Sequence, residues 1–379
     1  MPQNKIIYLD NAATTVVNNE VLEAYNKAKK LYFANPSSIH IPGQEAGRLL
    51  EKAREQILTL LKCQKEHELI FTSGATEANN LAIKGYALKH MNRGKHIITS
   101  NVEHPSVLET VKQLEETFGF EVSYLPVNKD GIIELEALRA AIRKDTILVS
   151  LMAVNNEIGA INPIHEIAKL LKQYPLIAFH VDATQSMGKI NLPYDEVDMF
   201  SFSGHKIHGL NSSGALIKRK KIELLPLLSG GGQENNLRSG TNDVALAVSL
   251  AKALRLSYEK IEENYKTIYP VADYLKKYII SHQESFELNS VDNPYIVNFS
   301  SKNKKASVIV EALSSRGIIV SSTSACHAKE EPISYVVKAL GKSDNLAHNT
   351  IRVSLSEKSS LDEIKQFISQ LEDIIKGLK

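Results

Sequence analysis

Short apolar runs alternate with amphipathic stretches from about residue 67 to residue 218. Four runs have the length and bounds of buried strands: "HELIFT", "KHIITS", "TILVSLM" and "LIAFHVD". Three stretches between them have the apolar spacing of helices: "EANNLAIKGYALKHM", "SVLETVKQLEETF" and "IHEIAKLLKQY". Because strands separated by helices of this length form βαβ units, the pattern predicts an α/β fold with a mostly parallel central sheet.

Two further runs, "VDMFSFS" and "GALIKR", have no helix between them and predict an antiparallel part of that sheet. The chain then becomes helical from Thr241 to about Ser281, and three later runs read as strands: "YIVNFS", "GIIVSS" and "TIRVSLS". A chain of 379 residues exceeds what one core usually fills. We therefore predict a large domain, 16–258, and a smaller α+β domain, 1–15 with 259–379, packed closely because no low-complexity linker separates them.

Composition is that of an ordinary soluble protein, with 43% hydrophobic and 23% charged residues. A formal charge of +2 gives no general attraction to nucleic acid or to an anionic membrane, so neither is expected as a direct partner. The N-terminus has no apolar stretch like that of a signal peptide, which predicts a cytoplasmic protein. Two distant cysteines form neither a disulfide framework nor a metal-ligand pattern, so no metal site is expected.

Polar groups cluster where predicted strands end, which is where open α/β sheets bind ligands. Ser73 to Thr76 precede a helix and could either cradle an anion or simply cap that helix. Asp182 ends one strand and could hold a protonated ring nitrogen, and Lys206 follows another in "SFSGHKIHG". A lone lysine there is usually a solvated surface residue. Pyridoxal phosphate requires three kinds of contact: an anion cradle for its phosphate, an acid for its ring nitrogen and a lysine that forms an imine with its aldehyde. The combination therefore favours that cofactor.

Cys326 lies in the stretch "SSTSACHAKEEP", set among small and charged residues that could hardly bury it. A structural cysteine usually sits inside an apolar run, so this one is either a nucleophile or an incidental thiol in a surface loop. Cys63, in "ILTLLKCQ", has apolar neighbours and is interpreted as structural or incidental.

The order and spacing of eight motifs resemble those of the cysteine desulfurases: "YLDNAATT", "FTSGATEANN", "NVEHPSVLE", "NNEIG", "VDATQS", "SFSGHKIHG", "RSGT" and "SSTSACHAKEEPISYVVKALG". These enzymes belong to the class V aminotransferase branch of the fold type I pyridoxal phosphate enzymes, and the resemblance covers nearly the whole chain. It implies a homodimer that converts L-cysteine to L-alanine and passes the sulfur to an enzyme cysteine as a persulfide.

The resemblance also implies roles for individual residues. Lys206 resembles the Schiff-base lysine, Asp182 the partner of the pyridine nitrogen, and Cys326 the sulfur acceptor on a mobile loop of about 321–335. His104 would stack on the ring and assist proton transfer, although alone it reads equally as a cap or core histidine. Gln185 matches the residue that contacts the ring hydroxyl, and Ala75 is a further cofactor-binding residue. The phosphate contacts within the chain match Thr76, Ser203 and His205, and the phosphate contact from the neighbouring subunit matches Thr241. The contacts to the substrate carboxylate match Asn155 and Arg352. Taken without the other motifs, Arg352 would be interpreted as one partner of a surface ion pair.

The chain departs from the family pattern after Lys206, where it has "IHGLNSSGAL", and after Cys326, where His327 and Lys329 replace small residues. The second departure and a short C-terminus leave the sulfur acceptor open between an iron–sulfur scaffold and a tRNA-thiolating sulfurtransferase. The same cofactor-binding residues would also serve two other activities: a selenocysteine lyase, or a cysteine β-lyase that releases sulfide directly. A binding protein that kept the fold without turnover is the remaining alternative.

Overall fold

The structure is a computed structural model and describes residues 6–322 and 333–377. Its strands are β1 (Ile7–Tyr8), β2 (His67–Thr72), β3 (His96–Ser100), β4 (Glu121–Leu125), β5 (Thr146–Met152), β6 (Ala178–Asp182), β7 (Met199–Ser203), β8 (Gly214–Arg219), β9 (Phe286–Leu288), β10 (Ile296–Ser301), β11 (Ile318–Ile319), β12 (Ser321–Ser322) and β13 (Thr350–Ser354). Its α-helices are α1 (Asn19–Leu31), α2 (Ile41–Leu60), α3 (Ala75–His90), α4 (Pro105–Phe118), α5 (Leu135–Ala141), α6 (Ile164–Leu171), α7 (Val244–Glu259), α8 (Ile261–Ser281), α9 (Ala306–Ser315), α10 (Tyr335–Ala339), α11 (Asp344–His348) and α12 (Leu361–Gly377).

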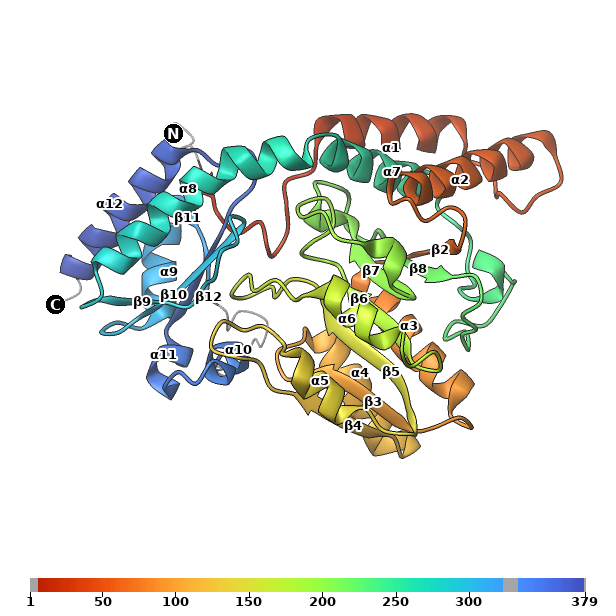
Figure 1. Cartoon of the computed structure of the whole chain (residues 1–379). Coiled ribbons are helices and arrows are strands. Elements are labelled where there is room, and N and C mark those ends of the chain that lie inside the picture. The colour runs from red at the N-terminus through yellow and green to blue at the C-terminus, as the bar shows by residue number, and fades with distance from the viewer. Residues whose placement is uncertain (1–5, 323–332, 378–379) are drawn as a thin grey trace.

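A seven-stranded sheet in the order β2-β8-β7-β6-β5-β3-β4 forms the centre of the large unit (Figure 1). The five strands from β7 to β4 are parallel, whereas β8 runs antiparallel to both β7 and β2. The predictions of a mostly parallel sheet and of an antiparallel part at β7 and β8 are therefore confirmed. The sequence reading missed β4, because "EVSYL" carries exposed and half-buried side chains and lacks an apolar run.

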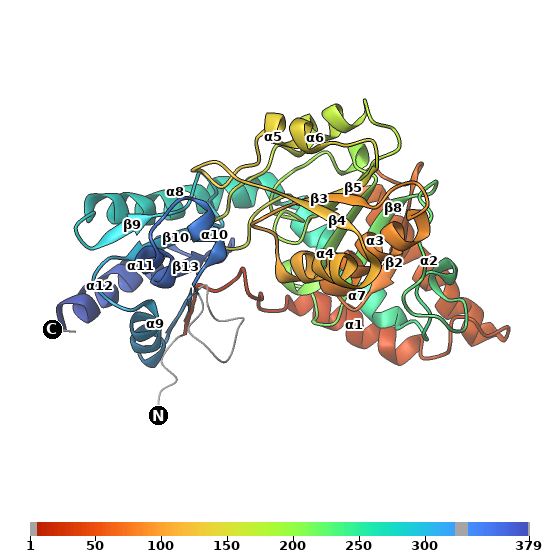
Figure 2. The same cartoon turned by 90° about the horizontal axis from the view of Figure 1, so that it is seen from below.

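Helices cover both faces of this sheet. Ile97 and Leu148 face the helices α3 and α4, while their neighbours Ile98 and Val149 point to the opposite face, where α2, α5, α6 and α7 supply the apolar side chains. Figure 2 shows α5 and α6 on one side of strands β3 to β5 and α4 on the other. Side chains alternate between the faces of a strand, so a strand buried on both faces must be apolar throughout. The continuous apolar runs in the sequence have this cause.

The second unit is built on a four-stranded sheet in the order β12-β13-β10-β9. Helices α8, α9 and α12 pack against it, and their buried residues form a separate hydrophobic cluster. The N-terminal segment joins this unit because β1 pairs with β11, and Ile7 and Leu9 belong to its cluster. These contacts support the predicted division at residues 15 and 258, whose bounds remain a prediction.

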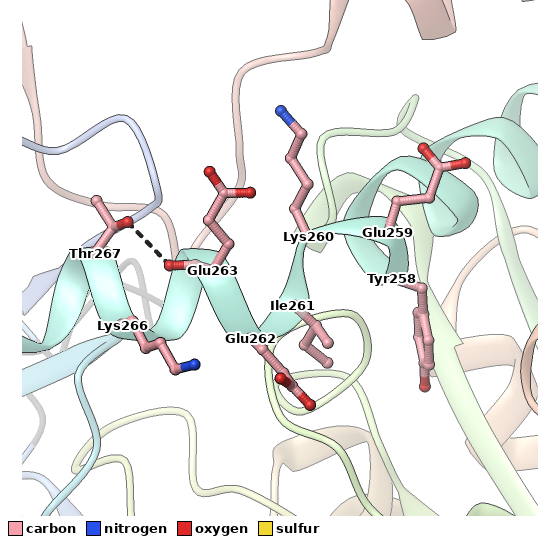
Figure 3. A pocket seen from close by; sticks show the side chains of 8 residues that line it. All are labelled: Tyr258, Glu259, Lys260, Ile261, Glu262, Glu263, Lys266 and Thr267. Atoms are coloured by element: carbon pink, nitrogen blue, oxygen red, sulfur yellow. Dashed lines mark hydrogen bonds between the residues drawn. The ribbon is translucent and has the colours of Figure 1, made fainter.

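The two units are joined by α7 and α8, which meet at Lys260. The backbone of Lys260 leaves the helical region there, with φ −125° and ψ 14°. Figure 3 shows the side chains around this junction, where the Thr267 hydroxyl donates to the carbonyl of Glu263 at 2.9 Å. Within the two described ranges, none of the helices has the length and apolar character needed to cross a bilayer.

Candidate active site

A cavity of about 510 Å³ lies between the two units. The large sheet contributes the carboxyl ends of β5, β6 and β7, where Met152, Asp182 and Ser203 line the wall. The small unit contributes Arg352 from β13, and the N-terminal segment closes another side. Open α/β sheets bind ligands in crevices at the carboxyl ends of their strands, so the fold places this cavity where a ligand is expected.

Lys206 ends the short 3-10 turn Gly204–Lys206 that follows β7. Its Nζ donates to the carbonyls of Ala12 and Ala13, at 2.7 Å each, in the N-terminal segment. Asp182 is 5% exposed, and its Oδ1 accepts from the backbone N–H of Thr184 at 3.0 Å. The structure therefore brings a lysine and a buried carboxylate to the wall of one cavity.

A hydrogen-bonded chain links Asp182 to His104. The amide Nδ2 of Asn79 donates to Asp182 Oδ2 at 2.8 Å and to Ser106 Oγ at 2.9 Å. His104 caps α4, and its Nδ1 accepts from the backbone N–H of Ser106 at 3.1 Å. Burial lowers the pKa of His104, and the charge of Lys206 acts in the same direction, while Asp182 opposes both. The ring is therefore neutral near pH 7, with its proton on Nε2.

The predicted anion cradle, Ser73 to Thr76, lies where β2 leads into α3. Gly74 has φ +152°, a conformation that side chains rarely adopt, and a Cβ there would lie 3.3 Å from Ser203 Oγ. Ser203 Oγ accepts from the backbone N–H of Ala75 at 2.7 Å, and Thr76 and His205 line the same cavity. Burial is the main cause that lowers the pKa of His205 to about 4, and the positive charges of nearby lysines lower it further. This imidazole is therefore neutral at pH 7. Backbone N–H groups at the start of α3 suit an anion.

Arg352 extends into the cavity from the small unit and is 8% exposed. Its NH2 donates to Asp10 Oδ1 at 3.0 Å and its NH1 to the carbonyl of Asn156 at 2.9 Å. Asn155 behaves differently: its Nδ2 donates to the carbonyl of Val102, and its Oδ1 accepts from two backbone N–H groups. Asn156 and Glu157 line the cavity in its place, so the predicted contact of Asn155 with a substrate stays a prediction.

Gln185 lines the cavity and donates from Nε2 to the carbonyl of Ala12 at 2.9 Å. Thr241 lies elsewhere: it is exposed and lines a separate cavity with Arg238 and Asn242. Within one chain the structure therefore brings together most of the predicted cofactor residues but not Thr241.

Cys326 lies outside the described residues. The described residues end at 322 and resume at 333. Near these two ends, Ser321, Ser322 and Tyr335 line the candidate cavity. The Tyr335 hydroxyl donates to the carbonyl of Glu103 at 2.6 Å, which joins the start of α10 to the His104 segment. Cys63 is 2% exposed, and burial raises the pKa of its thiol to about 12. It is the free cysteine of the described part of the chain, and a buried, protonated thiol there cannot act as a nucleophile at neutral pH.

Sequence reasoning missed several residues that complete the site: Asp10, Ala12, Ala13, Asn79 and Ser106. Asp10 and Asn79 stand inside the quoted motifs "YLDNAATT" and "FTSGATEANN", so the signal was present without a role attached to it. Ala12 and Ala13 contribute backbone carbonyls, and no side-chain pattern reveals such a contact.

Comparison with known proteins identifies the family of the chain. Residues 7–367 match the family Aminotransferase class-V, and the chain belongs to that family. Its relatives include the NifS/IcsS protein homolog of Lactobacillus delbrueckii subsp. bulgaricus, 41% identical over 97% of each chain. The cysteine desulfurase IscS of Dictyoglomus turgidum is also 41% identical, over 98% of this chain and 95% of the relative.

Solved structures give the same result. A NifS-like protein superposes with a TM-score of 0.91 and 35% identity, over 99% of this chain and 100% of its own. SspA in complex with cysteine superposes with a TM-score of 0.80 and 36% identity, over 93% of this chain and 100% of its own. The predicted fold class and the predicted resemblance to the cysteine desulfurases are confirmed.

Proposed function

We propose that this protein is a pyridoxal phosphate-dependent cysteine desulfurase, which converts L-cysteine to L-alanine and transfers the sulfur to Cys326 as a persulfide. One observation carries the proposal: Lys206, Asp182, His104 and Arg352 come from four separate segments and line the same cavity. Relatives named as cysteine desulfurases across nearly the full length support the same activity.

The residues present fit pyridoxal phosphate. The cradle at the start of α3 suits its phosphate, the buried Asp182 suits a protonated ring nitrogen, and Lys206 suits its aldehyde. The hydroxyl of Thr184 lines the cavity, is buried, and has no hydrogen-bond partner among the described residues, so a polar ligand group can pair with it. When bound, the cofactor would supply an electron sink for the substrate carbon.

The chain's own residues would hold the substrate and move protons around it. Arg352 offers a planar guanidinium, which binds a carboxylate through two parallel hydrogen bonds. The neutral His104 carries its proton on Nε2, which can donate it to a group in the cavity and take it back, while Nδ1 accepts from the backbone N–H of Ser106. The position of the ring is fixed through Ser106, Asn79 and Asp182.

Sulfur transfer requires a thiolate near the substrate sulfur. As the thiolate of Cys326 forms a sulfur–sulfur bond, the carbon–sulfur bond of the substrate breaks. The electron pair of the broken bond stays with carbon, which takes up a proton to give L-alanine. The lining of the cavity by Ser322 and Tyr335 supports this role, because both residues are close to Cys326 in the chain.

A homodimer is part of the proposal. Thr241 does not line the candidate cavity of its own chain, which leaves it available to a neighbouring subunit. Exposed apolar side chains near the junction of α1 and α2 support an interface, since Phe33 is 79% and Ile39 92% exposed. We infer that the sulfur passes on to an acceptor protein, either an iron–sulfur scaffold or a tRNA-thiolating sulfurtransferase, in the cytoplasm.

The test replaces Cys326 by serine. The variant should bind L-cysteine and the cofactor but form almost no alanine and carry no persulfide. Alanine, pyruvate, sulfide and protein-bound persulfide are measured in both proteins, with Cys63→Ala as the matched control that should keep all wild-type products. Pyruvate as the main wild-type product would indicate a β-lyase instead. Substantial alanine formation by Cys326→Ser would refute the proposed role of this thiol, and a strong preference for selenocysteine would indicate a lyase for that substrate.

A further inference from the structure

A second cavity, of about 420 Å³, shares Lys206 with the candidate active-site cavity. Its wall also contains Lys189, which belongs to the turn after β6 and has no role in the proposed mechanism. Thr15, Asn11 and Tyr295 add polar groups, so the space is large and polar enough to hold water. Two lysine side chains therefore line one polar cavity.

Hydrogen bonds tie Lys189 to the same backbone group that holds Lys206. Lys189 Nζ donates to Gln185 Oε1 at 3.3 Å. Gln185 Nε2 donates to the carbonyl of Ala12 at 2.9 Å, and Lys206 Nζ donates to that carbonyl at 2.7 Å. The contact also fixes which way the Gln185 amide faces, because only its oxygen can accept from Lys189.

The surroundings disfavour two positive charges at once. Burial lowers the pKa of Lys189 to about 7, and the charge of Lys206 is the next cause; Glu357 opposes this shift and Arg352 adds to it. Glu357, the nearby carboxylate, is itself paired with His208 at 3.2 Å. The other charged groups of the wall are Glu20, Glu259, Lys260, Glu263 and Lys358.

We propose that Lys189 is a positioning residue that acts through Lys206, as the acceptor of the proton that Lys206 must lose before its amine can bond to a carbonyl group. An N–H bond of Lys206 breaks, a bond to Lys189 Nζ forms by way of water in the shared cavity, and the pair keeps a single positive charge. Proton loss from one amine removes the repulsion that kept the other neutral, so each titrates with the other. This inference rests on the proposed function, because it assumes that Lys206 binds the cofactor aldehyde.

Its first test uses the cofactor-free protein and does not depend on turnover. Lys189 and Lys206 are acetylated with limiting acetic anhydride across pH 6 to 10, and each peptide is quantified by mass spectrometry. Wild-type Lys189 should react with a midpoint near pH 7. In Lys206→Met the midpoint should rise, so that Lys189 reacts about three- to ninefold more slowly at pH 6, the change that a rise of half to one pKa unit from a midpoint near 7 produces. Lys206→Gln is the second variant should the methionine variant fail to fold.

Lys276 is the matched control, because it is a partly buried lysine whose Nζ donates to the carbonyl of Val291 in the small unit. Burial lowers its pKa too, and its reactivity should not change in Lys206→Met. An unchanged Lys189 midpoint in Lys206→Met would overturn the proposal.

The second test separates proton acceptance from charge or shape. Pyridoxal phosphate is added to cofactor-free Lys189→Met and Lys189→Arg, and the rise of visible absorbance is timed. Both variants should incorporate the cofactor several-fold more slowly than the wild type at pH 7 and approach its rate at pH 9. The reason is that methionine has no nitrogen to accept the proton, and arginine keeps the proton it already carries. Wild-type rates in Lys189→Arg at pH 7 would overturn the proposal. Failure of the desulfurase proposal would appear in the product assay instead, while the acetylation result would stand.

Discussion

Replacing Arg352 by alanine should impair the use of L-cysteine far more than it impairs cofactor binding. Arg352 is 8% exposed and holds its guanidinium between the carboxylate of Asp10 and the carbonyl of Asn156. If the substrate carboxylate binds here, the variant loses the cation that the substrate needs. It also leaves the Asp10 carboxylate unpaired beside the same space, with a side chain 15% exposed.

The expected effect follows from the burial of this pair. Truncating one partner of a buried, hydrogen-bonded charge pair costs on the order of 2 to 4 kcal/mol. Since about 1.4 kcal/mol corresponds to a factor of ten, kcat/KM for L-cysteine should fall roughly 30- to 700-fold. Part of that loss comes from repulsion by Asp10, so Asp10→Asn in the same background should recover some of it. Arg352→Lys should be intermediate, because it keeps the charge but loses the planar fork.

The assay measures alanine formation over a range of L-cysteine concentrations and, separately, cofactor affinity from visible absorbance. Arg316→Ala is the matched control, because Arg316 lies at the end of α9 and donates to Gln370 at 2.7 Å on an exposed surface. Its kcat/KM should equal that of the wild type. An unchanged kcat/KM in Arg352→Ala, or a loss of cofactor affinity as large as the loss of kcat/KM, would show that the substrate carboxylate binds elsewhere.

Three further predictions address the cofactor, assembly and pH. Lys206→Ala should abolish the visible absorbance of covalently held pyridoxal phosphate, and the same spectrum in this variant would reassign the lysine. The wild type should sediment as a dimer that loses cofactor on dilution, more readily as Thr241→Ala; a monomer that keeps its cofactor would contradict this. Burial lowers the pKa values of His180 and His205 to about 4. Each imidazole therefore binds more protons in the unfolded chain than in the folded chain below about pH 6.5. Its contribution to the free energy of unfolding should fall between pH 7 and pH 4, by on the order of 3 kcal/mol for the buried His180 and by less for the partly exposed His205. Burial raises the pKa values of Glu103 and Glu157 to about 8 and about 7, and these carboxyls shift the stability in the opposite direction. Urea titrations therefore compare the wild type with His180→Gln at both pH values, and an equal loss of stability in the two proteins would mean that His180 titrates normally.

Local sequence patterns predicted the parallel strands well, because a strand buried on both faces must be apolar at every position. "TILVSLM" and "LIAFHVD" became β5 and β6 for this reason. The same logic failed for "EVSYL", an edge strand whose outer residues face solvent, and periodicity therefore gave no signal for β4. The break between α7 and α8 at Lys260 was also missed, since the helical pattern continues through it.

The sequence by itself determined the chemical inventory of the site: Asp182 at a strand end, Lys206 after the next strand, and a small-residue turn before a helix. Short-range order sets these features, because each depends on where one strand or helix ends. Only the tertiary structure decided which groups meet. The carbonyls of Ala12 and Ala13 reach Lys206 across more than 190 positions, and Asp10 reaches Arg352 across 342, because β1 pairs with β11 and carries the N-terminal segment over the cavity. Such contacts depend on how distant surfaces pack, and no pattern of neighbouring residues encodes them.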